Sequence, residues 1–338
     1  MKKKVVFALI LGICAIFAGV SIGSVPIGPL IVLKVILNKV FSIKLNGAVS
    51  PTFVSIIWYL RLPRVLLAFF VGAALAVSGS VVQSVLKNPL ASPFTLGVSA
   101  GASLGAGLVI VTGFTLPLIA GFTLPLVSVA LGLGTVFFAV SFASRFDKNM
   151  GSNTIILAGM VFSLFVNAIL TLISALSHDD LARITLWQMG SFSLKGWPYV
   201  TMMFPILVVG LIAVFFFSRE LDILTFGDEQ AQSIGVETGR VKWLLLGITA
   251  ALTGTAVAFA GVIGFIDLVA PHIVRKFFGS QHRYVLPMSA IFGGIFMVVA
   301  DIISRTIISP SELPIGAVTA IIGAPFFAYV YFKRERKN

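Results

Sequence analysis

The chain has 338 residues, of which 58% are hydrophobic and only 11% are charged, and its formal net charge is +12. Soluble domains carry charge on about a quarter of their residues, so this composition excludes a soluble globular protein. It also argues against a nucleic-acid-binding protein, because much of the basic charge lies at the two ends of the chain, in residues 2–4 and 333–337. Bases at such positions are typical of segments that flank membrane spans.

Long uncharged runs predict an all-α, polytopic membrane protein with about ten transmembrane helices, since one span needs about 20 apolar residues. In chain order, the expected spans are roughly 5–30, 62–85, two within 88–144, 152–175, 199–217, one on each side of Gly261–Gly264, 284–303 and 313–332. Lys and Arg then favour one side of the membrane by two to one. The positive-inside rule therefore predicts that both termini are cytoplasmic, in a single transmembrane domain covering 1–338.

The stretch LKNPLASPFTLGVSAGASLGA (86–106) contains a G-x-S-x-G pattern around Ser99. In hydrolases this pattern forms a strand–turn–helix that exposes the serine, but nothing near it resembles a strand. Gly97, Gly101 and Gly105 instead have the spacing of small residues that let two membrane helices pack closely. Prolines at 89 and 93 interrupt the preceding backbone, which predicts a broken helix beside a pathway, followed by a tightly packed span.

Among the arginines on the predicted outer side, against the general charge bias, three are candidates for function: Arg61, Arg64 and Arg305. The spacing of the first two places them on one side of a helix. Arginine at a helix end can extend its charge to the interface. Because guanidinium groups also bind carboxylates in a planar fork, docking of an acidic partner is the second interpretation.

One connecting segment, 218–243, is polar and contains five of the twelve acidic residues. Asp228 and Glu229 after Gly227 predict the start of a short helix, because carboxylates favour the positive end of the helix dipole. Gly235 is placed to end that helix. The segment is either an ordinary solvated loop or a docking surface for a cytoplasmic partner.

Asp267 and Asp301 are the acidic residues closest to predicted spans. An intramembrane carboxylate indicates function by default, for example a proton relay in a secondary transporter. Asp301 alternatively pairs with Arg305 one turn later, and Asp267 alternatively bonds to backbone at the Gly261–Gly264 break. The sequence contains no G-x-x-x-x-G-K-[ST] motif, so the chain is not expected to hydrolyse ATP, and no metal site is expected.

Four segments in order resemble the FecCD family of permeases for iron-siderophore, haem and vitamin B12 import. They are LRLPRVLLAFFVGAALAVSGSVVQSVLKNPLASPFTLGVSAGASLGA (60–106), LTFGDEQAQSIGV (224–236), GFIDLVAPHIVRKFFGSQHRYVLP (264–287) and ADIISRTIISPSELPIGAVTAIIGAPFF (300–327). The resemblance runs from about residue 55 to the C-terminus. It implies a type II ABC importer permease in a bacterial or archaeal cell membrane, which is a transport subunit and not an enzyme.

The resemblance also implies partners: a second permease copy, identical or paralogous, two ABC ATPase subunits that use ATP and magnesium, and an extracytoplasmic substrate-binding protein. No cofactor is expected on this chain, and nucleic acid is not an expected partner, whereas membrane lipid is. By position, Arg61, Arg64 and Arg305 are similar to the arginines that receive the binding protein.

The remaining site assignments follow from the same resemblance. Residues similar to those that contact the ATPase are Gly227, Asp228, Gln230, Ala231 and Gly235. Residues similar to those of the cytoplasmic gate are Asn88, Leu90, Ser152 and Asn153. Asp267 departs from the family pattern, where a small residue is usual, and a proton-coupled secondary transporter using Asp267 is the alternative function. The cargo is not readable from the sequence.

Overall fold

The computed structural model describes residues 2–43, 49–117, 119–147 and 150–335, and within these ranges every regular element is helical. Arg336 and Lys337, two of the C-terminal bases, lie outside the described residues. The longer elements are α1 (Lys2–Ser21), α2 (Pro29–Phe41), α4 (Leu62–Val85), α5 (Val98–Thr112), α6 (Thr123–Phe146), α7 (Ser152–Leu176), α9 (Gly196–Phe216), α12 (Thr238–Ala260), α13 (Ile266–Phe278), α14 (His282–Thr306) and α15 (Ile315–Glu335). The short elements are α3 (Pro51–Ser55), η1 (Ile56–Arg61), η2 (Pro93–Leu96), η3 (Ala120–Phe122), η4 (His178–Asp180), α8 (Leu181–Met189), α10 (Ser218–Leu224) and α11 (Asp228–Ser233).

The described chain contains seven helices that are long and apolar enough to cross a membrane, together with shorter apolar helices at Val98–Thr112 and Ile315–Tyr329. This confirms the all-α, polytopic class. The span expected after Gly264 is α13, which has 13 residues and therefore extends only about 20 Å. That length covers about two thirds of the hydrocarbon core of a bilayer. The eighth predicted span is thus shorter than a full span.

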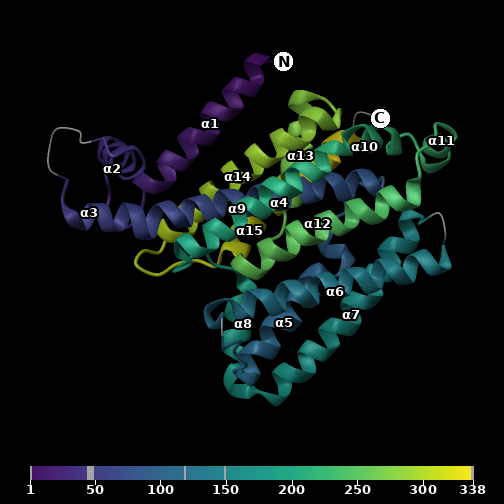
Figure 1. Cartoon of the computed structure of the whole chain (residues 1–338), viewed down its shortest axis with the longest axis horizontal. Helices are drawn as coiled ribbons and strands as arrows, with labels where there is room; N and C mark the ends of the chain where they lie inside the picture. Colours follow the sequence, from purple (N-terminus) through teal and green to yellow (C-terminus); the bar gives the residue numbers. More distant parts are fainter. Residues whose placement is uncertain (1, 44–48, 118, 148–149, 336–338) are drawn as a thin grey trace.

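Helix α4 forms the centre of the bundle and packs against α14, α12, α13 and α9 (Figure 1). It continues α3 and η1 without a break, so one apolar helix runs from Pro51 to Val85. The predicted bounds of 62–85 coincide with those of α4, but the continuous span begins earlier, at Pro51. Pro63 lies in the first turn of α4, where proline is tolerated, and the π-helical turn Ile56–Arg61 joins α4 to α3.

The first span ends earlier than predicted. Helix α1 ends at Ser21, and the uncharged run continues into a separate helix, α2, that begins at Pro29. Gly28 before it has extended backbone, and proline at the first helical position fits the start of a new helix. Apolarity alone gave no sign of this break, because the connecting residues are as uncharged as the helix.

The G-x-S-x-G stretch begins α5 and packs against α6, as predicted. Gly97 has φ +91 between η2 and α5, a conformation that favours glycine. A side chain added at Gly101 would overlap the backbone carbonyl of Leu131, and one at Gly105 would lie 2.7 Å from the carbonyl of Val127. These glycines therefore allow the backbones of α5 and α6 to approach closely.

The Gly261–Gly264 break places the start of α13 inside the bundle. Helix α12 ends at Ala260, and Phe265, with φ +70, directly precedes α13. The carbonyl of Asp267 then lies against Gly79 in α4, leaving no room for a side chain at that glycine. α13 is thus held by backbone contact within the bundle. The bundle has two ends, with α3 at one and α10 and α11 at the other (Figure 1).

Candidate functional site

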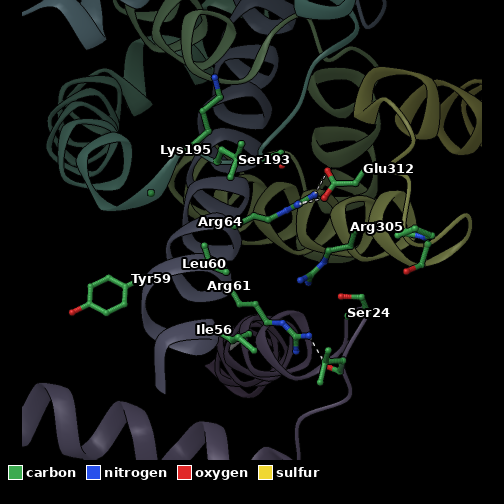
Figure 2. A pocket seen from close by; sticks show the side chains of 16 residues that line it. Ser24, Ile56, Tyr59, Leu60, Arg61, Arg64, Ser193, Lys195, Arg305 and Glu312 are labelled. Carbon is green, nitrogen blue, oxygen red and sulfur yellow. Dashed lines mark hydrogen bonds and ion pairs between the residues drawn. The ribbon is translucent and has the colours of Figure 1, made fainter. Parts of the chain in front are cut away.

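The three arginines predicted to dock a partner line one cavity at the α3 end of the bundle (Figure 2). Its volume is about 500 Å³. Lys195, just before α9, also lines it and lies 5.1 Å from the ring centre of Tyr199, and burial lowers the pKa of its ammonium group. The remaining lining residues are Gly23, Ser24, Val25, Ile56, Tyr59, Leu60, Ser193, Leu194, Gly196, Ser309, Pro310 and Glu312. The cavity therefore holds four basic side chains and one acid.

Arg61 closes the end of α1. It is 6% exposed, and its guanidinium donates to the carbonyls of Val20 and Ser21 at 3.1 Å and of Val25 at 2.5 Å. The last carbonyls of a helix have no partner within it and carry the negative end of its dipole. Arg61 satisfies them, so its donors are already used inside the chain.

Arg64 and Arg305 share the carboxylate of Asp301. Arg64 Nε lies 2.8 Å from Asp301 Oδ1, and Arg305 Nε lies 3.3 Å from Oδ2, which confirms the predicted Asp301–Arg305 pair. Arg305 also donates to the carbonyl of Gly19. The Nη1 and Nη2 atoms of Arg64 form a bidentate ion pair with the two carboxylate oxygens of Glu312, at 2.5 and 3.0 Å. Glu312, on the segment between α14 and α15, is the more exposed partner of that pair.

The polar segment 218–243 forms α10 and α11 at the opposite end, and the predicted short helix is confirmed. α11 begins at Asp228 after Gly227, whose φ is +126, and Gly235 follows it with φ +92. Of the other residues assigned to ATPase contact, Gln230 is exposed and Ala231 is buried beneath the helix. The segment therefore presents one polar face outward while Ala231 anchors it to the bundle.

Asp228 joins α11 to three other segments. Its Oδ2 lies 2.8 Å from the ammonium of Lys242 in α12 and 3.1 Å from that of Lys87 after α4. Lys242 is fully buried and also donates to the carbonyl of Met150, at 2.9 Å, just before α7. Burial alone raises the pKa of Asp228, and the hydrogen bonds and charges of the two lysines outweigh this effect and lower it.

The predicted gate residues lie directly beside this joint. Asn88 follows Lys87, and its side-chain oxygen accepts the amide of Leu90 at 2.9 Å, forming a tight turn. Leu90 is 43% exposed. Ser152 and Asn153 begin α7, two and three residues after Met150. The structure therefore brings both predicted gate segments to the start of α11, although their role as a gate stays a prediction.

A second cavity, of about 430 Å³, lies along α5. Its lining combines small apolar residues with uncharged polar side chains, and it has no charged group. The lining residues are Ser99, Ala100, Ser103, Asn167, Gln188, Met189, Val262, Gly316 and Ala317. Ser99 of the G-x-S-x-G pattern thus lines a cavity of mixed apolar and uncharged polar residues.

Asp267 is buried, 1% exposed, and lies in the first turn of α13. Its carboxylate accepts the hydroxyl of Ser92, just before η2. The sequence predicted either a proton relay or a bond to backbone at the glycine break, and this side-chain partner across the bundle was not expected. The carboxylate lines neither of the two cavities described above.

Comparison with known proteins identifies the family. The profile of the FecCD transport family matches residues 9–333. The chain belongs to this family. It is 43% identical over 322 residues to YvrB, an uncharacterised ABC transporter permease of Bacillus subtilis, covering 95% of this chain and 91% of YvrB. It is 36% identical to the hemin transport permease HmuU of Yersinia pestis, covering 83% and 85% of the two chains.

The fold of this FecCD protein matches a solved relative along its whole length. The relative is described as an inward-facing conformation of a metal-chelate type ABC transporter, with TM-score 0.85, 28% sequence identity, and coverage of 98% of this chain and 100% of the other. The chain is therefore a multi-pass membrane transport subunit and not an enzyme. The hydrolase interpretation of Ser99 is wrong, and His282 contacts Ser84, a serine of α4.

The structure adds partners in this FecCD permease that sequence reasoning missed. The contact between Glu312 and Arg64 had a signal in the sequence, because Glu312 is an acidic residue in a polar segment that follows the three arginines. Lys242 had a weaker sequence signal, because it is a basic residue inside a long apolar helix. Its bond to Met150 had none, because a backbone acceptor leaves no trace in composition.

Proposed function

We propose that this chain is the membrane-spanning permease of an ABC importer that carries a ferric siderophore, haem or a corrinoid into a bacterial or archaeal cell. Two ATPase subunits on the cytoplasmic side use ATP and magnesium, and a second permease copy, identical or paralogous, completes the pathway. The whole chain is one transmembrane domain with both termini in the cytoplasm. It binds no cofactor of its own.

The joint at Asp228 is the observation that carries this proposal. A transporter driven by a separate ATPase needs a surface that the ATPase moves and a link from that surface to the pathway. α11 offers the surface, with Gln230 outward, and Asp228 links it to both predicted gate segments through Lys87 and Lys242. The link is short, charged and half-buried, so a movement of α11 displaces it directly.

The arginine-lined cavity at the other end suits an acidic partner that arrives from outside the cell. Arg64 already binds the carboxylate of Glu312 in a bidentate ion pair, so its guanidinium is placed to bind an acid at the cavity. An extracytoplasmic binding protein with exposed acidic residues fits this chemistry. Arg61 and Arg305 hold the end of α1 beneath it, so they support the docking surface from within.

The cargo class rests on the relatives. HmuU of Yersinia pestis carries hemin in its name, and relatives named for cobalamin and Fe(3+) dicitrate import are 36% and 37% identical to this chain. These cargoes are all bulky metal chelates. The uncharged lining of the second cavity, with Ser99 and Asn167, suits passage of such molecules without trapping their charge.

The test is to extract the full chain from its native membrane in mild detergent, identify the proteins that purify with it, and assay ATP hydrolysis and uptake of haemin, ferric citrate and cobalamin. An ATP-binding-cassette subunit is expected to purify with the chain. The variant Asp228→Asn is expected to reduce coupled uptake roughly tenfold, the effect of losing one charge-assisted hydrogen bond. Asp179→Asn, at an exposed residue of η4 that is not part of the Asp228 joint, is the control and is expected to leave uptake unchanged.

Recovery of the chain alone, stable and without hydrolysis under conditions that preserve such complexes, would contradict the proposal. Uptake driven by a proton gradient and abolished by Asp267→Asn would then favour the secondary-transport alternative. Equal loss of uptake in Asp228→Asn and Asp179→Asn would contradict the specific role of the Asp228 joint.

A further inference from the structure

A second polar link begins on α10 and is separate from the Asp228 joint. Asp222 Oδ1 lies 2.6 Å from Nδ1 of His282 and 2.9 Å from its backbone nitrogen. On the far side of the ring, Nε2 lies 2.6 Å from the hydroxyl of Ser84 in α4. Arg275 of α13 lies 3.4 Å from the same hydroxyl. Four residues from four helices are therefore joined in one chain of contacts.

The hydrogen bonds in this series of contacts all run in one direction, from Arg275 towards Asp222. Asp222 only accepts, so the proton of a neutral His282 ring lies on Nδ1 and Nε2 is an acceptor. Ser84 then donates its hydroxyl proton to Nε2 and accepts from Arg275. The result is an ion pair between Arg275 and Asp222 that is bridged by a serine and a histidine. Ser80 offers the Ser84 hydroxyl an alternative acceptor, its backbone carbonyl at 3.0 Å.

Arg275 also begins a second branch, which leads to the start of α13. Its Nη1 donates to the side-chain oxygen of Gln83 at 2.5 Å, and the Gln83 amide donates to the backbone carbonyl of Asp267 at 3.2 Å. The carboxylate of Asp267 holds Ser92. The two branches therefore connect α10 to the first turn of α13 and to the chain just before η2.

Burial makes these contacts interdependent. His282 is 1% exposed, Gln83 4% and Ser84 5%, so water cannot replace a lost partner. A buried polar group left without its partner costs more than the hydrogen bond contributed, and linked hydrogen bonds strengthen one another. A shift of α10 therefore either moves the ring of His282 with it or breaks this series of hydrogen bonds. The arrangement resembles a hydrolytic triad, but Ser84 is buried within α4 and lines neither cavity.

We propose that His282 is a positioning residue that transmits displacement of α10, through Ser84 and Arg275, to the start of α13 and to Ser92. This inference rests on the proposed importer function for its role, and on the contacts alone for the connection. It gives α10 its own route into the bundle, beside the route from α11 through Asp228. It also gives Asp267, which departs from the family pattern, a task at the far end of that route.

Two variants of the full chain separate the halves of the histidine contact. His282→Asn keeps a group near Nδ1 that can contact Asp222, and His282→Gln keeps a group near Nε2 that can contact Ser84. Each is purified with its ATPase subunits and assayed for hydrolysis and for uptake of haemin, ferric citrate and cobalamin. Both variants are expected to lose uptake roughly tenfold while hydrolysis continues, because each breaks the chain at one point. His178→Asn, at an exposed histidine, is the control.

Wild-type uptake in either variant would overturn the proposal, since one half of the contact would then suffice. Loss of hydrolysis together with uptake, in a folded complex, would also overturn the proposal, because these contacts would then only stabilise the structure. If no ATPase subunit purifies with the unaltered chain, the importer function fails, and the connection is judged by the next measurement alone.

Nitrogen NMR of the histidine-labelled chain in lipid nanodiscs tests the connection without any partner. The His282 signals, assigned from their loss in His282→Gln, are expected to show a neutral ring protonated on Nδ1. Gln83→Met removes the amide of the other branch without touching the histidine, and it is expected to shift the His282 signals. An unchanged His282 spectrum in Gln83→Met would overturn the proposal, whatever the uptake assays show.

Discussion

The two ends of the bundle hold basic side chains in different ways. At the α3 end, Arg61 and Arg305 donate to the last carbonyls of α1, and Asp301 lies between two arginines on long helices. At the other end, Asp228 lies on a helix of six residues. Long packed helices keep their position without the charges, whereas a short helix has little packing of its own. The first arrangement therefore stabilises fixed helix ends, and the second positions an element that can move.

The largest effect is expected at the fixed end. Asp301→Ala removes the buried carboxylate between Arg64 and Arg305, so that Arg305 loses its paired acid and Arg64 keeps only Glu312. Removing one partner of such a cluster is expected to lower the free energy of unfolding by about 3–5 kcal/mol. Urea unfolding in detergent, followed by tryptophan fluorescence, measures it.

Asp180→Ala provides the matched control. It breaks an exposed pair with Arg183, and a loss below about 1 kcal/mol is expected there. Equal losses in Asp301→Ala and Asp180→Ala would show that the arginine end is no more fixed than an ordinary surface pair, and the comparison between the ends would fail.

The next effect concerns the middle of the bundle, where α13 begins. Gly79→Ala would place a methyl group against the backbone carbonyl of Asp267, which cannot move without shifting α13. A loss of about 1–3 kcal/mol is expected from such overpacking. Gly134→Ala, in α6, meets nothing within 4 Å and is expected to leave stability unchanged or raise it by up to about 1 kcal/mol. A neutral Gly79→Ala would contradict the backbone contact.

At the movable end, Lys242→Met is expected to act locally. It keeps the length of the buried side chain but removes the ammonium that joins Asp228 to the carbonyl of Met150. Hydrogen exchange at the amides of residues 150–155 is expected to become roughly tenfold faster, because local opening loses one buried partner. Arg240→Met, whose side chain is 77% exposed, is the control. Unchanged exchange in Lys242→Met would separate the gate segment from α11.

Lowering the pH should weaken the contacts of Asp228 with Lys87 and Lys242. The pKa of Asp228 is lowered in the folded chain, so its contribution to stability is present above the unfolded value of 3.8 and is lost as the pH falls through the lower folded value. The expected contribution is about 1 kcal/mol or less, because the carboxylate is partly exposed. Stability measured between pH 5 and pH 3 should fall less steeply in Asp228→Asn than in the wild type. Parallel curves would contradict the lowered pKa.

The fold class was predictable because each membrane span leaves a long uncharged run. Boundaries were predictable where a cap or a glycine marks them, as at Asp228 and Gly235. They failed where the backbone changes direction inside an apolar run, as between α1 and α2, since hydropathy is equal on both sides. The short length of α13 and its backbone contact with Gly79 were not predictable, because they depend on how α13 packs against α4.

The candidate site was predictable as a set of residue types and incompletely as contacts. Spacing along a helix predicted the Asp301–Arg305 pair, one turn apart. Contacts between distant segments, such as Arg64 with Glu312 or His282 with Asp222, depend on which helices pack together. The roles of the arginines, of the coupling residues and of Asn88, Leu90, Ser152 and Asn153 stay predictions.

The smallest effect is expected at the exposed link of the arginine end, and its sign sharpens the comparison. Arg64 keeps Asp301 when Glu312 is changed, so Glu312→Gln should cost less than about 1 kcal/mol, and this small cost should vanish in high salt because the pair is partly exposed. Unfolding measured at low and high sodium chloride tests this. A large, salt-insensitive loss would mean that the segment between α14 and α15 is as fixed as α1. Glu312 would then hold the cavity closed, instead of being the one partner of Arg64 that an incoming carboxylate can replace.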